Sequence, residues 1–145
     1  MALKLSLREN EKVIVNGAVI SPIGRSCDIL FHNRARILHE KDVLTDTEIF
    51  AAMEEEGSSR SDSWLYYLIQ LLYIDPDSGE RLMNQLTDTI TLLKADHPEQ
   101  SNAIDEIIGN IADGDLFFAM KNCQKAFPEC LSPKKYKKVL EHESV

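Results

Sequence analysis

Residues 33–42 read Asn-Arg-Ala-Arg-Ile-Leu-His-Glu-Lys-Asp, and the sequence changes character on the two sides of this stretch. Before it, runs such as Leu3 to Leu7 alternate between apolar and polar residues, which is the period of a half-buried β-strand. After it, apolar residues recur every three or four positions, which is the period of an amphipathic helix. The sequence therefore predicts an α+β fold in which a β part is followed by a helical part.

The part before this stretch predicts a small antiparallel sheet or sandwich of about five strands. Asn16-Gly17 favours a two-residue hairpin turn, because both residue types tolerate a positive φ angle. The residues just before this turn are apolar on both faces, which is typical of a central strand. We expect the strands at residues 3–7, 12–15, 18–20, 27–31 and 34–39.

The part after the stretch predicts a bundle of about four or five helices. Thr45 and Glu48 have the spacing of a capping box, so a short helix should begin after Thr45. Residues 57–63 read as a linker, because serine and glycine are frequent there. The expected domains are therefore a β lobe over residues 1–56 that ends in the short helix, this linker, and a helical bundle over residues 64–145.

Residues 64–74 are apolar almost all round, which is typical of a helix at the centre of a bundle or in an interface. We expect a polar cap at residue 62 or 63. If the helix lies in an interface, Trp64, Tyr67 and Leu71 are the expected partner-binding residues. The remaining helices are expected, from their caps and apolar stripes, at residues 76–94, 98–112, 116–127 and 133–142.

The net charge of −8 argues against a generic nucleic-acid binder or a membrane-surface protein. The charge is unevenly distributed, however. Residues 1–41 carry seven Lys or Arg against four Asp or Glu, a surplus of three that leaves −11 for the remaining residues. A basic lobe beside an acidic body is compatible with a local site for a polyanion.

Nothing in the sequence predicts a metal site, a cofactor or an enzymatic activity. Cys27, Cys123 and Cys130 are odd in number and lack the C-x-x-C spacing, so we expect reduced, mostly packed thiols. The longest apolar run is far shorter than the roughly 20 residues of a membrane-spanning helix, and the first residues show no secretion signal. We therefore expect a cytoplasmic, non-enzymatic protein with no membrane partner.

Two arginines carry the predicted polyanion site. In a strand, Arg34, Arg36 and Leu38 would share one face, while Ile37 would point to the core. The two guanidinium groups would then lie about 6.6 Å apart along the strand, a spacing comparable to neighbouring phosphates of a flexible single strand. A guanidinium group suits phosphate because it donates two parallel hydrogen bonds. The competing interpretation is a charged strand face exposed to water.

The neighbours of this pair extend the prediction. Arg25 and Lys41 flank the arginines in sequence and would give electrostatic support. Phe31 or His32 would offer a stacking face for a base. Four lysines between residues 134 and 138 form a second basic cluster, for which exposed charges on a short terminal helix are the simpler interpretation.

Five collinear stretches, together spanning nearly the whole chain, resemble the FlbT family of bacterial flagellum biosynthesis regulators. The matching stretches are Leu-Lys-Leu-Ser-Leu at 3–7, Glu-Lys-Val-Ile-Val-Asn-Gly-Ala-Val at 11–19, the opening stretch at 33–42, Tyr-Leu-Ile-Gln-Leu-Leu-Tyr-Ile-Asp at 67–75, and Gly-Asp-Leu-Phe-Phe-Ala-Met-Lys at 114–121. The chain departs from the family's pattern at residues 54–64, where the family tends to have a shorter segment.

The resemblance implies a post-transcriptional regulator of flagellin, which acts on the 5′ untranslated region of flagellin mRNA and affects its translation and stability. It also implies a functional pairing with another small flagellar protein, FlaF. The alternative is a protein-binding or chaperone-like assembly factor that engages flagellin or FlaF and affects the mRNA only indirectly. An exposed apolar helix or sheet edge would favour a homodimer.

Overall fold

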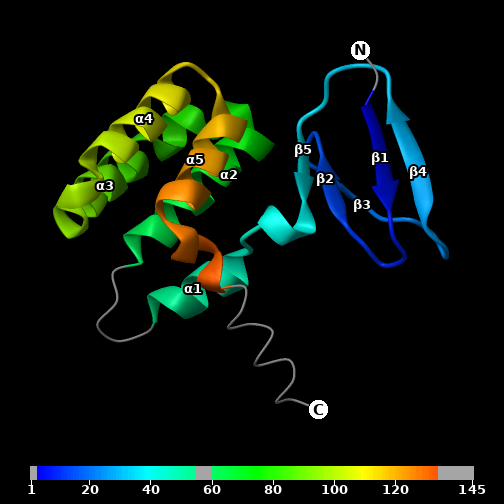
Figure 1. Ribbon diagram of the computed structural model, residues 1–145, viewed down its shortest axis with the longest axis horizontal. Coiled ribbons are helices and arrows are strands. Elements are labelled where there is room, and N and C mark those ends of the chain that lie inside the picture. The colour runs from blue at the N-terminus through cyan, green and yellow to red at the C-terminus, as the bar shows by residue number, and fades with distance from the viewer. Residues whose placement is uncertain (1–2, 55–59, 134–145) are drawn as a thin grey trace. The chain divides into compact units, whose positions relative to one another are not determined.

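Figure 1 shows the computed structural model, which describes residues 3–54 and 60–133. In that part of the chain five β-strands are followed by five α-helices, which confirms the predicted α+β fold. The chain divides into two compact units, Met1–Val43 and Leu44–Val145, which we call the β unit and the helical unit. Among the described residues, no helix combines the length and the apolar character that crossing a bilayer requires.

The β unit consists of two antiparallel sheets. In the first, β1 (Leu3–Leu7) pairs with β4 (Cys27–Phe31). In the second, β2 (Val13–Val15) lies between β3 (Ala18–Ile20) and β5 (Ile37–His39). β2 is therefore the central strand of its sheet, as its apolar residues predict.

The two sheets pack on each other through a small apolar core. Leu5 and Leu7 of β1 and Val13 of β2 are buried at its centre. Partly buried residues of the other strands and of β2 complete it: Val15, Ile20, Ile29, Phe31 and Ile37. The unit is thus a small sandwich, and each large apolar side chain that it buries fully contributes about 1.5–3 kcal/mol.

The last strand is shorter than the sequence predicts. β5 begins at Ile37, so Arg34 and Arg36 precede the strand and do not lie in it. The reason is the length of the neighbouring strand, because β2 ends at Val15 and the chain turns at Asn16 with a φ of 49°. Among the described residues, the pairing of β2 with β5 therefore ends at Val15 and Ile37 and does not reach the two arginines.

The helical unit contains α1 (Asp46–Met53), α2 (Ser61–Ile74), α3 (Gly79–Asp96), α4 (Ser101–Ala112) and α5 (Leu116–Ala126). α2 contacts α1, α3 and α5, and α4 contacts both α3 and α5 (Figure 1). The apolar stripes of these helices face one another, which is how a helical bundle buries its core.

α2 is the central helix of this unit, as its apolar sequence predicts. Every residue from Leu65 to Gln70 is buried. The helix begins three residues earlier than Trp64, at Ser61, and its N-cap is Arg60 in the left-handed conformation with a φ of 47°. Arg60 makes no side-chain cap bond, so the prediction of a polar cap at residue 62 or 63 was wrong.

Other helix boundaries follow local signals in the sequence. The Thr45 hydroxyl accepts a hydrogen bond from the Glu48 N–H at 3.2 Å, and the Glu48 carboxylate accepts one from the Thr45 N–H at 2.9 Å, which confirms the capping box. Pro76, Pro98 and Pro128 each begin a short 3₁₀ turn. The helix expected over residues 133–142 falls almost wholly outside the described residues.

The boundary between the units lies before α1, whereas α1 was expected at the end of the β lobe. The side chain of Gln70, which is buried in α2, forms hydrogen bonds with both the N–H and the carbonyl of Leu44. The Leu44 N–H donates to Gln70 Oε1 at 2.7 Å, and Gln70 Nε2 donates to the Leu44 carbonyl at 2.8 Å. α1 is thereby attached to the helices. Part of the predicted linker, residues 57–59, lies outside the described residues, and Ser61 to Ser63 belong to α2.

Candidate functional site

The strongest candidate for an anion-binding site in the β unit is the connection between β4 and β5, which carries Arg34 and Arg36. Both side chains are exposed. Within residues 3–54 and 60–133, neither guanidinium group forms an ion pair with a carboxylate. Exposed cations with no internal counter-charge are available to an anionic ligand.

The backbone of Arg36 is fixed on both sides by Asn16, the first residue of the β2–β3 turn. The Asn16 N–H donates to the Arg36 carbonyl at 2.8 Å. The Arg36 N–H donates to the Asn16 side-chain oxygen Oδ1, also at 2.8 Å. Asn16 thus continues the ladder with its side chain where the strand itself has ended, and it orients the start of β5.

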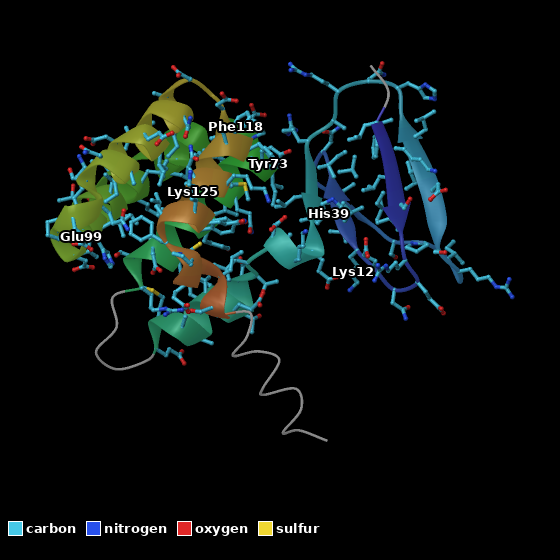
Figure 2. All side chains as sticks on the ribbon, viewed as in Figure 1. Lys12, His39, Tyr73, Glu99, Phe118 and Lys125 are labelled. Carbon is cyan, nitrogen blue, oxygen red and sulfur yellow. The ribbon has the colours of Figure 1, made fainter. Side chains whose placement is uncertain are left out.

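The four predicted cations do not gather at one place. Arg34 follows the end of β4 at Phe31, whereas Arg25 precedes its other end at Cys27. Arg36 precedes β5, whereas Lys41 follows it, beyond the end at which β5 pairs with Val13. Lys12 and His39 mark this second end of the sheet in Figure 2. Each pair is therefore separated by the length of a strand, and only Arg34 and Arg36 stay close in sequence.

The predicted stacking residues differ in their surroundings. Phe31, the last residue of β4, is half-buried and packs against the sandwich core. His32 is exposed and lies next to it in the connection. Leu38, which strand alternation placed on the face of the arginines, is buried. Ile37 packs against the sandwich core as predicted, but the alternation does not extend to the two arginines, because they precede β5.

Within the part of the chain that the structure describes, one ion pair lies in the β1–β4 sheet, and neither arginine takes part in it. Among the described residues, Asp28 accepts a hydrogen bond from the Ser6 hydroxyl at 2.7 Å and lies 3.5 Å from the Lys4 ammonium group. The hydrogen bond from Ser6, and then the charge of Lys4, lower the pKa of Asp28. All three side chains are exposed, so this contact lies on the protein surface and is not part of the core.

Two of the three predicted partner-binding residues of the helical unit, Trp64 and Tyr67, lie in a row of aromatic rings. Trp64 stacks on Tyr67 with 5.5 Å between ring centroids, and Phe50 of α1 lies 6.4 Å from Trp64. Tyr67 is only 7% exposed, and Leu71 and Trp64 are half-buried. Much of this row is thus part of the packing of α1 on α2, and the partner-binding role of Trp64, Tyr67 and Leu71 stays a prediction.

Sequence reasoning missed a second group of aromatic side chains. Tyr73 of α2 lies beside Phe117 of α5 with 6.4 Å between centroids, and Phe118 lies 6.0 Å from Phe117 (Figure 2). Both phenylalanines are exposed. The sequence contained a signal for this group. Adjacent helix residues point about 100° apart, so two neighbouring phenylalanines cannot both face one core.

The buried thiols show no sign of reactivity. Cys123 of α5 and Cys130 in the following turn are both buried. A hydrogen bond with Cys130, and then burial, raise the pKa of the Cys123 thiol, which keeps it protonated and unreactive. Cys27 is exposed. Within the described part of the chain, no three side chains of the metal-binding types are grouped to hold an ion.

Comparison with known proteins gives a consistent result. Residues 3–129 match the family described as flagellar protein FlbT. A probable flagellum biosynthesis repressor protein of Bradyrhizobium diazoefficiens is 30% identical over 129 residues, which cover 86% of this chain and 80% of that protein. A probable repressor of the same name from Agrobacterium fabrum is 27% identical over 121 residues, covering 82% of this chain and 74% of that protein.

The flagellum biosynthesis repressor protein FlbT of Caulobacter vibrioides is also similar. It is 27% identical over 85 residues, which cover 59% of this chain and 54% of that protein. No solved structure matches the chain.

Proposed function

The chain belongs to the FlbT family of flagellar proteins, and from that membership we propose that it regulates flagellar synthesis by binding flagellin mRNA. Its relatives are named repressors of flagellum biosynthesis, which supports a regulatory role in flagellar synthesis. The finer proposal is that it binds the 5′ untranslated leader of the flagellin message and changes its translation and stability. No catalytic step is part of this function.

The proposed RNA contact is supported by the exposure and the charge environment of Arg34 and Arg36. Both are exposed, and neither is neutralised by a carboxylate among the described residues. The backbone of Arg36 is held by two hydrogen bonds from and to Asn16, so little order has to be created when a ligand binds. Such guanidinium groups would bind phosphates, and His32 would stack on an unpaired base.

A mobility-shift assay with a flagellin leader transcript at low salt tests this function. Replacing Arg34 and Arg36 together by Ala should weaken binding about tenfold or more and reduce the salt dependence by roughly two counterions. Arg25→Ala is the matched control, because Arg25 is also exposed but lies at the opposite end of β4. Equal affinity of the double variant and the unaltered protein would exclude this site.

The same purified protein distinguishes the alternative function. Leader RNA, flagellin and FlaF are each offered separately to the immobilised protein. Retention of the RNA alone, and its loss in the double variant, is the expected result. Retention of flagellin or FlaF without the RNA would instead mean that the protein acts on a protein partner and that its effect on the message is indirect.

A further inference from the structure

The helical unit carries a group of aromatic and acidic side chains, most of them exposed, where α2 ends and α5 begins. Tyr73, Phe117 and Phe118 form the apolar part, with the ring contacts given above. Asp75 and Asp115, both exposed, follow Tyr73 and precede Phe117 by two residues each. We call these five residues the aromatic–acidic patch. It is built where the end of α2 lies beside the start of α5.

The aromatic part is more exposed than helix packing requires. Phe117 is 42% exposed and Phe118 is 57% exposed, although the next residues of α5, Ala119 and Met120, are fully buried. Adjacent exposed aromatic rings on a rigid helix are typical of the centre of a protein interface.

The charges around the rings restrict which kind of partner can bind to the patch. Asp115 occupies the N-cap position of α5 but its side chain makes no cap bond, so its carboxylate is turned to water. Asp113 and Asp77, nearby in sequence, are exposed as well. An RNA backbone would be repelled by these carboxylates, and a second copy of the patch would be repelled in the same way.

One contact shows which charge the rings accept. Lys121 places its ammonium group over the ring of Phe117, 5.5 Å from the centroid. This is a cation–π contact, in which the electron-rich face of the ring attracts a positive charge. Aromatic faces next to carboxylates therefore suit lysine or arginine side chains together with apolar ones.

We propose that the aromatic–acidic patch is the docking surface for a basic segment of a partner protein, in which apolar side chains pack on Phe117 and Phe118 while flanking lysines or arginines meet Asp75 and Asp115. This surface is separate from Arg34 and Arg36 and does not depend on the proposed RNA binding. A protein with both surfaces would hold an anionic ligand on the β unit and a cationic protein segment on the helical unit.

Two synthetic peptides test the chemistry of the partner. Both carry the same leucines, but one has lysines on either side and the other has glutamates. Fluorescence anisotropy with the full chain should show binding of the lysine peptide, weakening as salt rises, and no binding of the glutamate peptide. Equal binding of both peptides would overturn the proposal, because charge would then play no part.

Two variants locate the binding surface. Phe118→Ala should weaken binding of the lysine peptide about tenfold, which is the effect of removing an aromatic side chain at the centre of an interface. Phe50→Ala is the matched control, because Phe50 is 55% exposed on α1 of the same unit and should leave the affinity unchanged. Similar losses in the two variants would show that the peptide merely adheres to exposed aromatic rings, and would overturn the proposal.

The same assays test the role of the two carboxylates and the identity of the bound partner. Asp75→Asn together with Asp115→Asn should weaken peptide binding several-fold, and asparagine preserves the acceptor that Asp75 offers to the Asp77 N–H. Phe118→Ala should leave binding of the leader RNA unchanged. If it instead weakened RNA binding, or abolished a dimer detected by analytical ultracentrifugation, the patch would belong to RNA or to a second copy, and the proposal would fail.

Discussion

The two units of this chain differ in both their cores and their charges. The β unit buries three residues at the centre of its core, whereas α2 of the helical unit alone buries six consecutive residues. Residues 1–43 carry seven Lys or Arg against five Asp or Glu, a net charge of +2 that leaves −10 for residues 44–145. The chain therefore combines a small, weakly basic sandwich with a larger, strongly acidic bundle.

This difference fits the two proposed binding surfaces. A small sandwich can present two arginines on a connection fixed by one asparagine, because such a site needs little apolar surface. An acidic bundle is poorly suited to a polyanion, but it can offer aromatic rings to a cationic protein segment. The two units should therefore respond differently to changes in their cores and to changes in their surface chemistry.

The largest effect is expected in the core of the helical unit. Leu65 of α2 is fully buried, so Leu65→Ala should lower the free energy of unfolding by about 3 kcal/mol, from lost apolar burial and the cavity left behind. Amide hydrogen exchange should show the loss in α2, α3 and α5 while the strands keep their protection. Equal loss of protection in the strands would mean that the two units unfold together, and would remove the basis of the comparison.

A smaller effect is expected where α1 joins the helices. Gln70→Ala leaves the buried N–H and carbonyl of Leu44 without partners, which should cost about 2 kcal/mol. Faster hydrogen exchange in α1 would report the loss. Gln85→Ala on the exposed face of α3 is the control and should change stability by less than about 0.5 kcal/mol. If the two glutamines behave alike, Leu44 does not hold α1 to this unit.

Much of the fold was predictable because its signals are local. The capping box of Thr45 and Glu48 and the positive φ of Asn16-Gly17 each depend on residues within one turn. The attachment of α1 was not predictable, because it depends on a hydrogen-bonded pair 26 residues apart. The serine and glycine residues of the predicted linker did not mark the boundary between the two units. The buried Gln70 instead attaches the start of α1 to the helical unit.

The candidate site was predictable in part for the same reason. That Arg34 and Arg36 are exposed follows from local polarity. Their position outside β5 depends on where β2 ends, and the separation of Arg25 from Arg34 depends on the pairing of β4 with β1. Strand pairing connects distant parts of the sequence, and alternation within one strand does not reveal it.

Asn16 offers a test of how the β unit presents its arginines. Asn16→Gly keeps the positive φ but removes the acceptor of the Arg36 N–H, whereas Asn16→Ala also imposes strain of about 1 kcal/mol at φ 49°. Both variants should weaken leader-RNA binding several-fold, although both arginines remain, and only the Ala variant should lose this additional stability. If Asn16→Gly binds RNA as well as the unaltered protein, the fixed backbone of Arg36 is irrelevant to the site.

The smallest effect is expected at Asp28 on the surface of the β unit. Its pKa lies below the ordinary value of 3.8, so the folded form holds fewer protons than the unfolded form in acid. The resulting stability is complete above that ordinary value and is lost as the pH falls through the lower pKa of the folded form. Because the carboxylate is exposed, salt should reduce the contribution of Lys4.

Two variants separate the causes of this pKa. The hydrogen bond from Ser6 is the largest single cause, and Lys4 acts through both its charge and a hydrogen bond, so Ser6→Ala and Lys4→Ala should each return the pKa of Asp28 towards its ordinary value. An NMR titration of the Asp28 carboxyl group measures both shifts, and added salt should diminish only the one caused by Lys4. An unchanged pKa in either variant would mean that the contact removed there does not contribute to the shift.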